Sequence, residues 1–155
     1  MVRLKDIAAR AGVSIMTVSK VLRDEPDISA ATKARIRTLA AEMGYVPDRM
    51  AQSLRNHTTK LFGLVISAAT NPIFARVVTA IEEQAHVLGY DLILAHSLNL
   101  PEREDAVIRR LLSRRVDGLF LSPVYRLEPR AAIYEELAKC GTPTVILGQR
   151  APFCE

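Results

Sequence analysis

The sequence is poor in the features that mark membrane, secreted and redox proteins. No run of apolar residues approaches the ~18 that a membrane-spanning helix needs. The N-terminal residues 1–6 have no apolar stretch typical of a secretory signal, so we expect a cytoplasmic location. The two cysteines, Cys140 and Cys154, are too few for a disulfide scaffold and too far apart for a CxxC pair. Membrane-spanning, collagen-like and small secreted classes are therefore excluded.

The motifs of common enzyme chemistries are missing as well. No GxGxxG follows a predicted strand and no GxxxxGK[ST] occurs, so neither dinucleotide-binding nor P-loop chemistry has its phosphate cradle. The three histidines, His57, His86 and His96, are isolated and lack metal-ligand spacing. No Ser/His/Asp set is favoured over any other. We therefore expect no catalytic activity, no cofactor and no metal site.

The chain does carry charge, and that charge is unevenly distributed. It has 155 residues, 49% of them apolar, which suits one ordinary domain or two small ones and argues against disorder. Residues 1–60 hold 11 Lys and Arg against 6 Asp and Glu, whereas residues 61–155 hold 10 against 11. A basic segment beside a near-neutral one is typical of a nucleic-acid-binding head on a separate body, although a solvated basic face has the same composition.

Before residue 60 the apolar spacing is helical and the helices are short. A first helix ends at Gly12, and its apolar face consists of Leu4, Ile7, Ala8 and Ala11. Ser14 can cap a second helix, whose inward side chains are Val18, Val21 and Leu22. A third helix starts after Ser29 and stops at Gly44, with an apolar face of Ile36, Leu39, Ala40 and Met43. This arrangement predicts a helix-turn-helix.

From residue 61 short apolar runs alternate with helical stretches. The predicted strands are 61–67, 91–96, 117–122 and 143–148, and the predicted helices between them are 73–89, 102–115 and 129–140. This alternation indicates βαβ units, a parallel sheet and right-handed crossovers. The strands are apolar on both faces, as a sheet covered by helices on both sides requires. The predicted fold class is therefore α + α/β, a helical head followed by a parallel-sheet body.

Several short segments then add a more specific signal. They are LKDIA at 4–8, AGVS at 11–14, TVS at 17–19, GYVP at 44–47, AQSL at 51–54, GLV at 63–65, NP at 71–72, GYD at 89–91 and RVDG at 115–118. In order and spacing they resemble the lactose-repressor (LacI/GalR) family of transcription regulators. The resemblance implies a helix-turn-helix head at 1–47, a hinge helix and linker at 48–60, and part of a periplasmic-binding-protein-like effector domain, its N-subdomain, at 61–155.

The resemblance assigns DNA contacts to the head. In a helix-turn-helix the second helix lies in the major groove, which implies base reading by Ile15, Met16 and Lys20. Lys20 can donate to guanine O6 and N7, whereas Ile15 and Met16 offer apolar contact to thymine methyls; packing within the head is the alternative for these two. Four hydroxyl residues resemble phosphate-contacting positions, and each also suits a cap or a surface site: Ser14, Thr17, Ser19 and Ser29.

Residues 48–56 resemble the family's hinge helix, which is too short to be stable alone in water. In the family, two such helices of a dimer pair in the minor groove. The resemblance makes Leu54 an apolar wedge between base pairs and Ala51 a small residue that permits close approach. Packing of Leu54 on the body is the alternative. Asp48 departs from the Asn that is commoner in relatives, but it can still cap the helix.

The body is expected to bind a small molecule, because open α/β sheets hold ligands at the carboxyl ends of their strands. The resemblance implies a sugar or nucleobase-like effector, with ordinary loop chemistry as the alternative for the residues concerned. They are Asn71, Ile73, Phe74, Ser97, Asn99, Ser122 and Gln149. The helix around Val77, Ile81 and Ala85 is expected either at a dimer face or in the core.

Together these features predict a sequence-specific regulator, a repressor in most of the family, that binds a pseudo-palindromic DNA operator as a homodimer. Relatives continue into a second subdomain, so we expect these 155 residues to be an N-terminal portion with lost or incomplete effector control and an exposed apolar edge. Two alternatives stay open. One is a small-molecule-binding or interaction module with a merely solubilising head, and the other is a nonfunctional truncated fragment.

Overall fold

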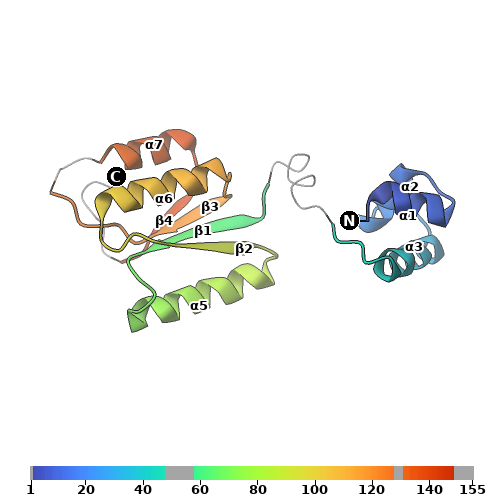
Figure 1. Ribbon diagram of the computed structural model, residues 1–155, viewed down its shortest axis with the longest axis horizontal. Coiled ribbons are helices and arrows are strands. Elements are labelled where there is room, and N and C mark those ends of the chain that lie inside the picture. The colour runs from blue at the N-terminus through green and yellow to red at the C-terminus, as the bar shows by residue number, and fades with distance from the viewer. Residues whose placement is uncertain (1, 48–57, 128–130, 149–155) are drawn as a thin grey trace. The chain divides into compact units, whose positions relative to one another are not determined.

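The computed structural model describes residues 2–47, 58–127 and 131–148. The chain forms two compact units, residues 1–48 and 49–155, which we call the head and the body (Figure 1). Within the described ranges, no helix is long and apolar enough to cross a membrane.

The head consists of three short helices whose ends are set by local capping. They are α1 (Leu4–Ala11), α2 (Ile15–Leu22) and α3 (Ala30–Glu42). Gly12 ends α1 in the left-handed conformation, with φ of 66°, which glycine adopts without steric cost. The Ser14 hydroxyl oxygen then accepts a hydrogen bond from the Thr17 amide and begins α2. The predicted helices and their helix-turn-helix arrangement are confirmed.

The core of the head is small and fully apolar. Its buried side chains come from all three helices: Ile7, Ala8, Ala11, Val18, Val21, Ile36 and Ala40. The Arg35 guanidinium donates to the Ala11 carbonyl at 3.1 Å and so joins α3 to the last turn of α1. The predicted inward faces of the three helices therefore meet in one cluster.

The body is a parallel sheet with helices on both faces. In chain order it contains β1 (Leu61–Ile66), α5 (Pro72–Val87), β2 (Asp91–His96), α6 (Pro101–Ser113), β3 (Gly118–Leu121), α7 (Ala132–Cys140) and β4 (Thr144–Ile146). The strand order is β2-β1-β3-β4, and every pairing is parallel. Helices α6 and α7 lie over one face and α5 lies on the other (Figure 1). The predicted α/β fold is confirmed, with β3 and β4 shorter than expected.

The main core of the body lies between the sheet and the α6–α7 layer. It includes Val65 of β1, Leu119 and Leu121 of β3, and Ile108 and Leu111 of α6. A Cβ atom at Gly63 would lie 2.9 Å from a Leu119 methyl carbon and 3.0 Å from one of Leu111. A side chain at this position of β1 would therefore have to displace the ends of the Leu119 and Leu111 side chains, which pack closely over Gly63.

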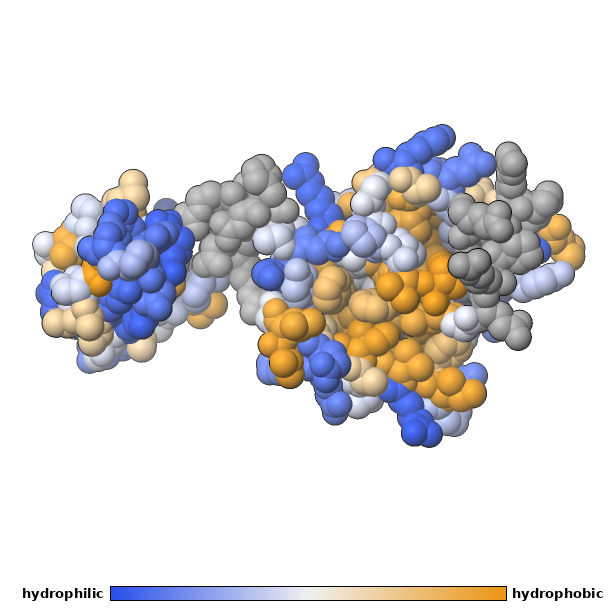
Figure 2. Space-filling view, turned by 180° about the vertical axis from the view of Figure 1, so that it is seen from behind, coloured by the Kyte–Doolittle hydropathy of each residue, from blue (hydrophilic) through white to orange (hydrophobic). Residues whose placement is uncertain are grey.

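The opposite face of the sheet is less completely covered in the described part of the chain. Helix α5 packs against β1 and β2, whereas Val145 of β4, on this same face beside Phe120, is 52% exposed. Leu94 of β2 is also exposed. Figure 2 shows apolar residues gathered over one face of the body. An exposed apolar surface of this kind favours association with another surface.

Candidate nucleic-acid interface and effector edge

Helix α2 divides its side chains between the core and solvent. Val18 and Val21 are fully buried and fix the helix in the head. At its capped N-terminus, Ile15 is 52% and Met16 is 64% exposed. Neither is part of the buried core cluster, so these apolar side chains remain available to an external surface. Exposure at the first turn of the second helix suits contact with base edges in a major groove.

Lys20, the third predicted base-reading residue, already has a partner. Its ammonium forms an ion pair and hydrogen bond with Asp27, in the acidic turn between α2 and α3. This hydrogen bond to Lys20 holds the pKa of the Asp27 carboxyl below its ordinary value. Lys20 can reach a guanine only by leaving Asp27 or by sharing one of its protons.

The acidic turn pairs with further cations of the head. Arg23 is 3.1 Å from Glu25, and the Asp24 carboxylate lies 3.0 Å from the Lys33 ammonium and 2.7 Å from the Arg37 guanidinium. The hydrogen bonds from Lys33 and then Arg37 lower the pKa of Asp24. Sequence reasoning missed these pairs because Asp24 and Arg37 are separated by a turn and most of α3. The basic charge of the head is thus partly neutralised before any partner arrives.

The predicted phosphate-contacting hydroxyls all make bonds within the head. Ser14 caps α2, and its oxygen lies 2.9 Å from the Thr17 hydroxyl. Ser29 caps α3 through the Thr32 amide at 3.3 Å. The Ser19 hydroxyl accepts a hydrogen bond of 2.9 Å from Arg23. The capping alternative therefore describes Ser14 and Ser29, and any contact with phosphate must be made in addition to these bonds.

The carboxyl ends of the parallel strands place several predicted effector residues at one edge of the body. Asn71 caps α5 by accepting from the Ile73 amide at 3.0 Å, and both residues are exposed. Phe74 and Ser122 are half-buried and Asn99 is exposed. Ser97 differs, because it is fully buried and its hydroxyl donates to the Ile66 carbonyl at 3.3 Å. Its hydroxyl is thus used inside the sheet.

Three predicted site residues cannot be placed. Ala51 and Leu54 of the expected hinge helix, and Gln149 of the expected effector edge, lie outside the described residues. In the part of the chain that the structure does describe, no three His, Cys, Asp or Glu side chains are grouped as a metal ion would need.

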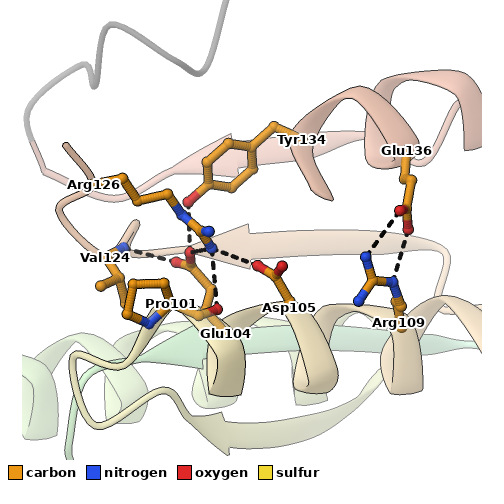
Figure 3. A network of polar contacts seen from close by, with 8 residues as sticks. All are labelled: Pro101, Glu104, Asp105, Arg109, Val124, Arg126, Tyr134 and Glu136. Carbon is orange, nitrogen blue, oxygen red and sulfur yellow. Dashed lines mark hydrogen bonds and ion pairs between the residues drawn. The ribbon is translucent and has the colours of Figure 1, made fainter. Parts of the chain in front are cut away.

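A buried polar network behind the effector edge was missed by sequence reasoning. Glu104 of α6 is fully buried and accepts from the Val124 amide at 2.7 Å, the Tyr134 hydroxyl at 2.7 Å and the Arg126 guanidinium at 2.6 Å (Figure 3). Arg126 also lies 2.5 Å from Asp105. Burial opposes the charge of Arg126, but these hydrogen bonds prevail and raise its pKa. The network joins α6, the segment after β3 and α7, and therefore orders the chain that follows Ser122.

A helix-turn-helix head and a parallel α/β body with a ligand-type edge together define the class of two-part DNA-binding regulators. The family model of bacterial regulatory proteins of the lacI family matches residues 3–48. A second model, of periplasmic binding proteins and the sugar binding domain of the LacI family, matches residues 59–149. The chain belongs to the LacI family.

Individual relatives agree with this assignment. The chain is 33% identical to the ribose operon repressor of Escherichia coli strain K12 over 153 residues, which is 99% of this chain and 46% of that protein. It is 38% identical to the HTH-type transcriptional regulator GntR of the same strain, over 77% of this chain and 36% of that protein. It thus spans less than half the length of these relatives.

A solved relative gives the same picture in three dimensions. The lac repressor dimer bound to operator and the anti-inducer ONPF superposes with a TM-score of 0.79 and 28% identity. The match covers 94% of this chain and 44% of that one. The expectation that the chain corresponds to the N-terminal part of family members is confirmed.

Proposed function

We propose that this chain is a sequence-specific DNA-binding transcription regulator, acting as a repressor, that binds a pseudo-palindromic operator as a homodimer. The observation that carries the proposal is the first turn of α2, where Ile15 and Met16 are exposed on a helix that buried Val18 and Val21 hold in place. This exposed apolar pair lies outside the core cluster of the head. It has a role against thymine methyl groups in a major groove.

The chemistry of the head divides the work between specificity and affinity. Ile15, Met16 and Lys20 are the proposed base-reading residues. The hydroxyls of Ser14, Thr17, Ser19 and Ser29 are proposed to contact phosphates, which supports affinity and register without reading sequence. Ala51 and Leu54 are proposed to act in the minor groove. Two of the relatives named above, which are a ribose operon repressor and an HTH-type transcriptional regulator, support this assignment.

We further propose that the body carries the effector and dimer functions. Asn71, Ile73, Phe74, Asn99, Ser122 and Gln149 are the proposed effector contacts, with a sugar or nucleobase-like molecule as the ligand. Ser97 supports this edge from inside the sheet through its bond to Ile66. The exposed apolar surface of the body is the proposed source of self-association. No catalytic step is proposed, and a regulator of DNA acts in the cytoplasm of a bacterium.

The experiment is a selection of duplexes from a random pool by the full chain, followed by binding titrations of the selected and a scrambled duplex at several salt concentrations. We expect an inverted repeat to be enriched. Affinity for the selected duplex should fall linearly on a log–log plot against salt, and should exceed that for the scrambled duplex by about 10³-fold or more. Failure to enrich any duplex, or equal affinity for both, would contradict the proposal.

A further inference from the structure

The segment that leads into β1 is held at the amino-terminal edge of the sheet by one carboxylate. Asp117, directly before β3, accepts hydrogen bonds from three consecutive residues. The Thr59 amide lies 2.9 Å from its Oδ1 atom and the Lys60 amide 3.0 Å from Oδ2. The Thr59 hydroxyl is 3.0 Å from Oδ1, and the Thr58 hydroxyl donates to Oδ2. Both carboxylate oxygens are therefore used.

The same segment is tied to both neighbouring strands. The Thr59 hydroxyl also lies 2.7 Å from the Arg115 carbonyl, just before β3. The Lys60 carbonyl accepts from the Asp91 amide at 2.9 Å, where β2 begins. The Lys60 ammonium lies 4.3 Å from the centre of the Tyr90 ring. Residues 58–60 are thus fixed from two sides.

The backbone at this junction has a conformation that L-residues rarely adopt. Lys60 has φ of 54°, and Arg115, whose carbonyl accepts from the Thr59 hydroxyl, has φ of 55°. Non-glycine residues persist in this region only where the surrounding contacts determine their conformation. The bonds to Asp117 supply such contacts, so the junction is a specified structure rather than an ordinary loop.

We propose that Asp117 is a positioning residue for operator binding, because it fixes residues 58–60, which are the described residues of the body nearest to the head in sequence. The inference rests on the proposed function. Ten residues, 48–57, separate this junction from the described head. With the junction held, docking of the head on an operator does not also have to order residues 58–60.

Two physical effects of releasing the junction differ in size. Releasing residues 58–60 adds three residues to the ten that separate the junction from the described head, and this change in chain length alters an effective concentration by less than about twofold. Ordering a freed residue again on binding lowers affinity by roughly 5- to 30-fold. Removing a negative charge changes the affinity in the opposite direction, because it favours binding to DNA. A loss of affinity on neutralising Asp117 therefore identifies the ordering effect.

The test is Asp117→Asn in the full chain, measured against the duplex selected by the wild-type chain and against a scrambled duplex. The asparagine side chain has an NH2 group in place of one carboxylate oxygen. This group cannot accept a hydrogen bond, so the bonds to that oxygen are lost. We expect about tenfold weaker binding to the selected duplex, a change of less than about twofold for the scrambled one, and an unchanged melting temperature of the head. The charge-matched control is Glu135→Gln, on the exposed surface of α7, which should bind as the wild type does.

A milder pair of variants tests the junction without altering charge. Thr59→Val keeps the shape but loses the hydroxyl, whereas Thr59→Ser keeps the hydroxyl. We expect Thr59→Val to weaken binding to the selected duplex by about threefold and Thr59→Ser to match the wild type. Equal behaviour of the two would overturn the proposal.

Hydrogen exchange of single amides locates the effect. In Asp117→Asn the Thr59 and Lys60 amides should exchange at least about tenfold faster, whereas the Ser122 amide, bonded to the Val65 carbonyl at 2.8 Å, should be unchanged. Faster exchange at Ser122 as well would overturn the idea of a local anchor, as would an Asp117→Asn affinity within twofold of the wild type. If the wild-type chain selects no duplex, both the proposed function and this inference are contradicted.

Discussion

At the scale of single residues, neighbouring positions on α2 have different roles. Ile15 and Met16 are apolar and exposed, whereas Val18 and Val21 are apolar and fully buried. The side chains alone do not distinguish the two pairs. Their places around one short helix do, because Ser14 fixes where the helix begins and therefore which face turns toward the core.

This difference predicts opposite effects of two substitutions. The double variant Ile15→Ala/Met16→Ala should change the free energy of unfolding by less than about 0.5 kcal/mol, because both side chains are exposed. It should nevertheless reduce discrimination between selected and scrambled duplexes by about tenfold or more. Val18→Ala, the control on the same helix, should cost about 2 kcal/mol of stability. Urea unfolding and duplex titrations check both, and a large stability loss in the double variant would contradict the assignment.

The ion pair of Lys20 with Asp27 makes a second residue-scale prediction. Asp27→Asn removes the partner of Lys20 and should strengthen binding to the selected duplex by about threefold, since Lys20 is then free to donate to a base. Asp24→Asn removes the same charge from the same turn but releases Lys33 and Arg37 of α3 instead. Equal gains in the two variants, measured by duplex titration, would show a general charge effect and no role for Lys20 in reading bases.

At the scale of elements, the buried Glu104 network joins α6 to the segment after β3 and to α7. Its energetics differ from those of the exposed pair formed by Arg109 and Glu136, whose side chains are 51% and 45% exposed (Figure 3). Removing the charge of Glu104 leaves the buried Arg126 guanidinium with only the partly exposed Asp105 carboxylate as its partner, whereas the exposed pair is screened by water.

We therefore expect Glu104→Gln to lower the free energy of unfolding by about 3 kcal/mol. The matched variant Glu136→Gln should lower it far less, because water screens the exposed pair. Urea unfolding of the full chain, followed by a signal specific to the body, measures both. Similar small losses in the two variants would show that the network does not stabilise the segment after β3.

The anchor at Asp117 gives the body a dependence on pH. Partial burial opposes its charge, but the hydrogen bonds from Thr58, Thr59 and Lys60 prevail and hold the pKa of the carboxyl below its usual 3.8. A pKa lowered by folding stabilises the fold above about pH 4, and this stabilisation is lost as the pH falls through the folded-state value. The stability difference between wild type and Asp117→Asn should therefore stay constant from pH 7 to about pH 5 and shrink as the pH falls below about 4, as urea unfolding would show. A difference that also stays constant below about pH 4 would contradict this prediction.

The elements themselves were largely predictable, because their signals are local. Gly12, Ser14 and Ser29 set helix ends within one turn of chain, and short apolar runs predicted the strands found in the described residues. The partners of Lys20, the buried hydroxyl of Ser97 and the Glu104 network were not predictable. Each depends on which segments folding brings together, and spacing along one element contains no information about that.

At the scale of the whole molecule, the two units carry separate cores and separate chemistry. The core of the head contains only residues of α1, α2 and α3, and the core of the body only residues after 60. In the proposed function the protein is a homodimer, which presents two identical heads to the two half-sites of one operator. Affinity for a full operator therefore combines two binding events through an effective concentration.

This symmetry makes the spacing of half-sites a test of the whole molecule. Half-sites read by a symmetric dimer lie on one side of the duplex, about one helical turn apart or a multiple of it. Inserting about five base pairs turns one half-site to the opposite side, so the second head cannot bind without distortion of the protein or the DNA. We expect affinity for the altered duplex to fall by about 10²-fold, to that of a duplex in which one half-site is scrambled. Titrations of the three duplexes compare their affinities directly, at a salt concentration at which about 10 nM protein half-saturates the original duplex.

Inserting about ten base pairs restores the original side of the duplex and should recover part of the lost affinity. An affinity that does not depend on the spacing would mean that one head binds alone, which would contradict recognition by a dimer.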